Sequence, residues 1–75
     1  MSDTSQRLAY LIKDLGVSNN SFAASVGISK SSISRILSGE IEPTVKTIKK
    51  ITEATKVSPN WLLGYGKINV IEKIE

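Results

Sequence analysis

The chain has 75 residues, 40% of them hydrophobic and 23% charged, with a net charge of +3, no His and no Cys. A chain this short holds one domain with a modest core, and without imidazole or thiol groups it lacks disulfides, zinc sites and most catalytic dyads, so we expect neither an enzyme nor a bound cofactor. No apolar run approaches the roughly 18 residues that cross a bilayer and the N-terminus lacks a secretory signal, so we expect a cytoplasmic protein without a membrane segment.

The first predicted helix covers roughly residues 4–15. Its apolar side chains follow the i, i+3, i+4, i+7 spacing of one helix face: Leu8, Leu11, Ile12 and Leu15. Asp3, with Gln6 three residues later, gives a start that resembles a capping box. Gly16 can adopt the left-handed conformation that ends a helix.

Two short helices are predicted next, joined by a tight turn at residues 27–29. Ser18 and Ser29 are placed to cap their N-termini, and Gly27 and Gly39 can end them with a positive φ. The expected inward side chains are Phe22, Ala23 and Val26 in the second helix and Ile33, Ile36 and, as a further candidate, Leu37 in the third.

A loop over residues 40–43 follows, because Pro43 disfavours a helical residue before it and cannot donate a backbone hydrogen bond. Thr44 is then placed to cap a fourth helix. Its expected buried face carries Val45, Ile48, Ile51 and Thr55, and its solvated face carries Lys46, Lys49, Lys50 and Glu53.

Ser58 followed by Pro59 predicts a short fifth helix over residues 60–63, which the Gly-Tyr-Gly sequence at 64–66 should end. We expect Trp61 in this helix to close the core rather than to stack on a base. The tail from 67 to 75 is ambiguous. Its isoleucines, spaced by three, suit a helix, whereas the apolar and polar alternation over 68–70 suits a strand.

The pair of helices around Gly27 carries the strongest motif in the chain. Two helices joined through a glycine-containing turn of about three residues are typical of the helix-turn-helix, whose second helix enters the major groove of DNA. Ala23 is small enough for the two helices to cross closely, and Ile33 supplies the apolar side chain that the crossing needs. The positions in register are Phe22, Ala23, Gly27, Ile28, Ile33, Ile36 and Gly39.

With these positions the chain resembles the phage-repressor and Cro-like family of helix-turn-helix proteins, also called the XRE family, from about Arg7 to Gly66. The resemblance includes the sequence SPNWLLGYG at 58–66. It implies an all-α, compact five-helix bundle over residues 1–66 that regulates transcription, as a repressor, by binding specific double-stranded DNA. The implied partners are a palindromic operator and a second copy of the chain in a homodimer.

The resemblance places the base-reading residues on the third helix, at Lys30, Ser31, Ser34 and Arg35. Arg35 is the best candidate, because a guanidinium can present two donors to O6 and N7 of a guanine. Lys30 can reach a guanine or a phosphate, whereas the two short serines need close approach or a bridging water. The alternative for Lys30 and Arg35 is an ordinary solvated helix face.

Five residues are candidate phosphate contacts: Asn19, Asn20, Ser38, Thr44 and Lys46. By resemblance, Asn19 matches a frequent glutamine of the family, and Ser38 matches its polar residue before the glycine that ends the recognition helix. Asn19, Asn20, Thr44 and Lys46 also stand at helix starts, where free N–H groups and the helix dipole attract anions. Simple helix capping explains these four residues equally well.

Two departures from the family pattern support an alternative function. Leu37 stands where the family usually has a polar residue, and the loop over 40–42 is acidic where many members are basic or neutral. Two carboxylates there would repel a DNA phosphate. The alternative is a protein-interaction module of antitoxin or antirepressor type with the same fold, which would use Leu37, Ile41 and the acidic loop.

The tail, residues 67–75, is too apolar for an ordinary solvated end, with Ile68, Val70, Ile71 and Ile74. We assign these residues as a C-terminal tail to the domain at 1–66. A dimer contact, disorder and docking on a further C-terminal domain are the three interpretations.

Overall fold

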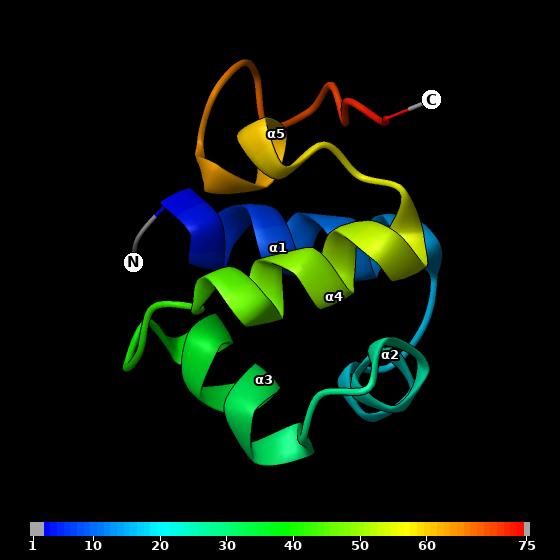
Figure 1. Ribbon diagram of the computed structural model, residues 1–75, viewed down its shortest axis with the longest axis vertical. Coiled ribbons are helices and arrows are strands. Elements are labelled where there is room, and N and C mark those ends of the chain that lie inside the picture. Colours follow the sequence, from blue (N-terminus) through cyan, green and yellow to red (C-terminus); the bar gives the residue numbers. More distant parts are fainter. Residues whose placement is uncertain (1–2, 75) are drawn as a thin grey trace.

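The computed structural model describes residues 3–74, which form an all-α bundle as the sequence predicts. The helices are α1 (Asp3–Leu15), α2 (Asn19–Val26), α3 (Lys30–Ser38), α4 (Val45–Thr55) and α5 (Pro59–Leu63). α2 and α3 make up one end of the molecule and α5 with the chain that follows it the other, with α1 and α4 between them (Figure 1). α1 packs against α3 and α5, and α4 packs against α2 and α5.

The N-termini of α2, α3 and α4 are capped as the local sequence predicts, whereas Ser58 before α5 makes no side-chain capping hydrogen bond. The side chains of Ser18, Ser29 and Thr44 each accept a hydrogen bond from the backbone N–H three residues later, at 3.1, 3.1 and 3.2 Å. Such a cap typically contributes about 1 kcal/mol to stability. Gly27 and Gly39 end α2 and α3 with φ of 75° and 82°, a region that glycine enters without steric cost.

One hydrophobic core joins all five helices. Its buried side chains are Leu8, Leu11, Ile12, Phe22, Ala23, Val26, Ile33, Ile36, Ile48, Ile51, Val57, Trp61 and Leu62. The predicted inward faces of α2 and α3 are confirmed, and Leu37 is half-buried against this core. Trp61 is completely buried, as predicted for a residue that closes the core.

The predicted apolar faces of α1 and α4 are wrong at two helix ends. Leu15 is 41% exposed and Val45 79% exposed, although both continue the spacing of a buried stripe. Each is the terminal residue of its helix, where the periodicity continues but no neighbouring helix covers it. In α4, Thr52 is buried, and Thr55, which was predicted on the buried face, is only half-buried. Asp3 also lies inside α1, in its first turn, and not in the residue before the helix.

Arg7 joins α1 to the end of α5 through a set of contacts that the sequence did not predict. The residue is only 7% exposed, and its side chain donates hydrogen bonds to the carbonyl oxygens of Trp61 and Tyr65, both at 2.9 Å, and of Gly66. The guanidinium carbon lies 5.5 Å from the centre of the Trp61 ring, a cation–π contact. Arg7 therefore ties α1 to α5 and to the chain that follows it.

The tail folds back along the connection between α4 and α5. Lys73 forms an antiparallel bridge with Val57, flanked by hydrogen bonds from Ser58 N to Glu72 O at 2.7 Å and from Ile74 N to Lys56 O at 2.8 Å. This part of the tail is therefore extended. Residues 68–70, where the alternation suited a strand, form a turn instead, and the tail forms no helix over the described residues. Ile71 packs against the core, while Ile68, Val70 and Ile74 remain exposed.

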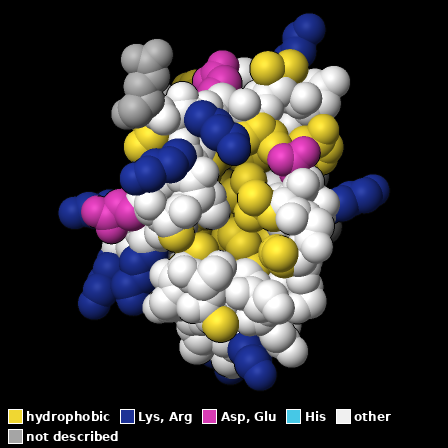
Figure 2. Space-filling model, turned by 90° about the vertical axis from the view of Figure 1, so that its right-hand side faces the viewer, with side chains coloured by type: hydrophobic (Ala, Val, Ile, Leu, Met, Phe, Trp, Pro, Cys, Tyr) yellow, Lys and Arg dark blue, Asp and Glu magenta, His cyan; other side chains and the backbone are white. Residues whose placement is uncertain are grey.

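Apolar side chains also form a band on one face of the molecule. Figure 2 shows this band on the side where α4 ends and the chain passes from α1 to α2, with charged side chains mainly around its margins. Over residues 3–74, none of the helices is both long enough and apolar enough to cross a membrane.

Candidate nucleic-acid interface

The structure builds a helix-turn-helix from α2, the turn at residues 27–29 and α3. The turn is closed by a hydrogen bond of 3.0 Å from Ile28 N to Ala23 O, made possible by the left-handed conformation of Gly27. Ala23 is buried where α2 and α3 pack together, and Ile33 is buried on the facing helix. The small and the apolar residue thus occupy the roles that the spacing predicted for them.

Two long-range hydrogen bonds fix this unit to the rest of the fold. Ser5 Oγ of α1 donates to Ile36 O of α3 at 2.6 Å in a buried position. Lys50 Nζ of α4 donates to Gly27 O in the turn at 3.1 Å. The sequence predicted Lys50 on a solvated face and missed this bond, because no local pattern links residues 23 positions apart. α3 is therefore held at its C-terminal end by α1 and near its start by α4.

The four predicted base-reading residues share the outer face of α3. Lys30, Ser31, Ser34 and Arg35 are all exposed, while Ile33 and Ile36 point into the core. The spacing i, i+1, i+4, i+5 places the four on one side of a helix. The structure therefore brings together one guanidinium, one ammonium and two hydroxyl groups on an accessible helix surface.

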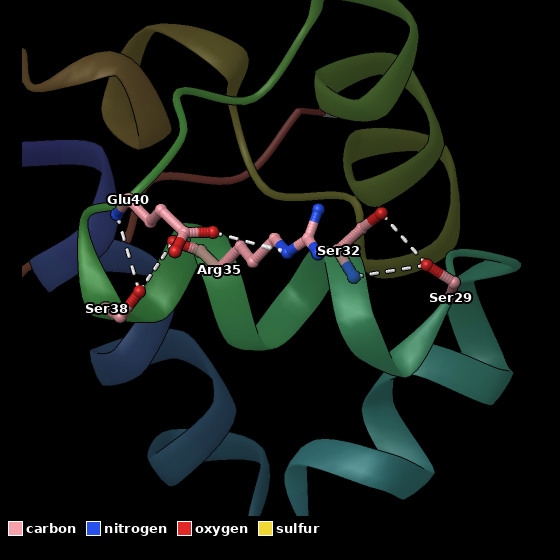
Figure 3. Close-up of polar contacts among 5 residues, drawn as sticks. All are labelled: Ser29, Ser32, Arg35, Ser38 and Glu40. Atoms are coloured by element: carbon pink, nitrogen blue, oxygen red, sulfur yellow. Dashed lines mark hydrogen bonds and ion pairs between the residues drawn. The ribbon is translucent and has the colours of Figure 1, made fainter.

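An ion pair connects Arg35 with the loop after α3. The Arg35 Nε lies 3.2 Å from Glu40 Oε2, and the two side chains are 60% and 63% exposed. In Figure 3 the Arg35 side chain extends along α3 toward Ser32, and the Glu40 carboxylate reaches its Nε. The sequence predicted that this acidic loop repels phosphate, but it did not predict the pairing with Arg35.

The predicted phosphate contacts are accessible, and two of them already make hydrogen bonds within the chain. Asn19 and Asn20 are exposed in the first turn of α2, and Lys46 is exposed in the first turn of α4. Ser38 Oγ donates to Arg35 O at 3.0 Å (Figure 3), and Thr44 Oγ1 donates to Thr47 Oγ1 at 3.1 Å while capping α4. Thr44 is thus a helix cap, and its role toward phosphate stays a prediction.

Nothing in the described part of the chain gathers the ligands that a metal ion needs, since no three acidic side chains there form a cluster. A shallow pocket lies beside Tyr10, Lys13 and Asp14 on α1, with a volume of about 420 Å³. It is open to solvent and separate from the exposed face of α3. The polar face of α3 is therefore the main candidate site.

A helix-turn-helix family model matches residues 8–62, well over half of the chain. The chain therefore belongs to the helix-turn-helix family, of the phage-repressor and Cro-like XRE type, whose members are DNA-binding regulators of transcription. Neither the curated proteins nor the solved structures with which the chain was compared gave a match. The matched range includes α2, α3 and every residue of the exposed α3 face.

Proposed function

We propose that this protein binds a specific double-stranded DNA sequence by placing α3 in the major groove, and that it represses transcription by occupying an operator. The observation that carries the proposal is the exposed polar face of α3, with Arg35 as the guanine contact and Lys30, Ser31 and Ser34 beside it. Contacts to base edges give sequence preference, and contacts to phosphates give most of the affinity and fix the orientation of the protein.

Asn19, Asn20, Ser38, Thr44 and Lys46 are the proposed phosphate contacts. The first turns of α2 and α4 present backbone N–H groups as well as these side chains, and both features favour an anion. Because such contacts release counterions, the logarithm of the binding constant should fall linearly with the logarithm of salt concentration, with a slope near −0.9 for each phosphate contacted. Binding that is insensitive to salt would contradict direct binding to a duplex.

A homodimer on a palindromic operator completes the proposal. α3 has nine residues and can contact only a short half-site, so a second copy of the helix is needed for a longer sequence. The exposed Ile68, Val70 and Ile74 of the tail and the apolar band in Figure 2 supply apolar surface for a dimer contact.

In vitro selection from a random duplex pool tests this function. We expect the native protein to enrich a two-fold site and the Arg35→Ala variant to lose the preference for guanine at one position in each half-site. Lys67→Ala is a matched control, because it removes one exposed positive charge from the chain that follows α5, a segment that lies at the end of the molecule opposite α3 (Figure 1). Enrichment of the same site by native protein and Arg35→Ala would contradict reading by this residue.

The alternative function is binding to a protein partner. Ile41 is exposed between Glu40 and Glu42, which is the surface that this alternative requires. Leu37, its other anchor, is half-buried against the core and offers less area than the sequence suggested. A protein that enriches no duplex at low salt would favour this alternative over the operator.

A further inference from the structure

The pairing of Arg35 with Glu40 follows from the way in which α3 ends. Glu40 N donates to Arg35 O at 2.9 Å and Gly39 N donates to Ile36 O at 3.1 Å, with Gly39 in the left-handed region. These two bonds define a Schellman motif, in which the residue after the glycine lies beside the residue five positions before it. A hydrophobic contact commonly fills that position, and here an ion pair takes its place. Glu40 therefore stands next to Arg35 because of the backbone.

The ion pair engages one particular nitrogen of the guanidinium. Glu40 Oε2 lies 3.2 Å from Arg35 Nε. In Figure 3 the two terminal nitrogens lie beyond the paired Nε, and neither donates a hydrogen bond to another group among residues 3–74. A guanidinium can address a base edge either with its two terminal nitrogens or with Nε and one terminal nitrogen. Because the Glu40 carboxylate pairs with Nε, it blocks the arrangement that uses Nε and leaves the two terminal nitrogens available for a base edge.

The ion pair contributes little to the stability of the fold, because both side chains are more than half exposed and water screens the attraction between them. A carboxylate near the DNA backbone also opposes binding by repelling phosphate. The role of the pair is to order the Arg35 side chain. A free arginine loses rotamer freedom when it binds a guanine, whereas an arginine that is already paired with a carboxylate has lost much of that freedom beforehand.

We propose that Glu40 is a positioning residue that holds Arg35 so that its two terminal nitrogens meet the guanine edge. Glu40 thereby increases the preference for guanine while it lowers affinity for DNA in general. The proposal rests on the function proposed above, since it requires Arg35 to contact a guanine.

The decisive measurement is a ratio of two dissociation constants. One is for the selected duplex and the other for the same duplex with the guanine read by Arg35 replaced in each half-site. We expect Glu40→Ala to bind both duplexes more tightly and to reduce the ratio by about three- to tenfold, a part of the discrimination that one arginine fork provides. Glu40→Gln retains an oxygen acceptor for the Nε–H and should keep more of the ratio than Glu40→Ala does.

Glu42→Ala is the matched control, because it removes the other carboxylate of the loop, which forms no ion pair with the described residues. It should also tighten binding but leave the ratio unchanged. A ratio that Glu40→Ala leaves intact would overturn the proposal. The same applies if tighter binding comes with a larger ratio, since Glu40 would then simply compete with DNA for Arg35.

A measurement without DNA separates this inference from the proposed function. Hydrogen exchange of the Arg35 Nε–H, followed by NMR, should be slower in the native protein than in Glu40→Ala, with Glu42→Ala like the native protein. Equal rates would show that the pair does not order Arg35. If exchange is slowed in the native protein but Arg35→Ala keeps the full guanine preference, then reading by Arg35 is wrong, and positioning for guanine is overturned with it.

Discussion

Arg7 of α1 and Arg35 of α3 carry the same guanidinium, and the fold uses the two groups differently. Arg7 is buried, donates to three carbonyl oxygens in and after α5 and lies over the Trp61 ring. Arg35 is mostly exposed and has one ion-pair partner, the carboxylate of Glu40. At the first site the protein itself satisfies the donors. At the second site the terminal donors remain accessible to another molecule.

The difference shows that burial decides whether an arginine of this chain stabilises the fold or remains available for recognition of another molecule. A buried guanidinium is stable only when its hydrogen bonds are made, and it then links the segments that supply the acceptors. An exposed guanidinium contributes little to folding, so it can be used for a ligand at small cost to stability. Three substitutions test this comparison.

Arg7→Ala should have the largest effect on stability, a loss of about 3 kcal/mol in the free energy of unfolding, because three hydrogen bonds from one guanidinium, one of them buried, and the contact with the Trp61 ring are lost together. Arg7→Lys should restore less than half of that loss, since an ammonium cannot reproduce the planar fork. Urea unfolding followed by circular dichroism measures both. A loss below about 1 kcal/mol for Arg7→Ala would show that solvent replaces these contacts, and the contrast with Arg35 would fail.

Ser29→Ala should have an intermediate effect of about 1 kcal/mol, because the hydroxyl caps α3 by accepting the hydrogen bond from Ser32 N. Ser31→Ala makes the same chemical change two residues later on the exposed face and should alter stability by less than about 0.5 kcal/mol. Equal losses from the two variants, measured by the same urea titration, would show that the cap does not hold the start of the helix.

Arg35→Ala should have the smallest effect on stability, below about 0.5 kcal/mol, because the ion pair that it removes is exposed. The same variant should lose the guanine preference described above, so stability and recognition separate at this position. Thermal unfolding with and without the selected duplex measures both properties in one experiment. A loss above about 1 kcal/mol would place Arg35 with Arg7, among the residues that hold the fold.

Sequence features whose effects extend over only a few residues predicted much of the secondary structure of this protein. The caps at Ser18, Ser29 and Thr44 and the positive φ at Gly27 and Gly39 are decided by hydrogen bonds and steric limits within one helical turn. The apolar spacing then predicted the buried faces of α2 and α3. The Arg35 and Glu40 pair also belongs to this local class, since the glycine cap sets it. The spacing of Arg35, Gly39 and Glu40 carries that signal, although it was not used to predict the pair.

The sequence by itself therefore determined five helices and an exposed polar face on the second helix of a helix-turn-helix. Tertiary structure alone decided which donors are buried and which helix ends are covered. Arg7 meets carbonyls more than 50 residues away, and Lys50 meets the turn at Gly27. Val45 and Leu15 continue a buried pattern but extend past their neighbours. Such contacts depend on how the helices are placed in space, which the periodicity of one helix cannot specify.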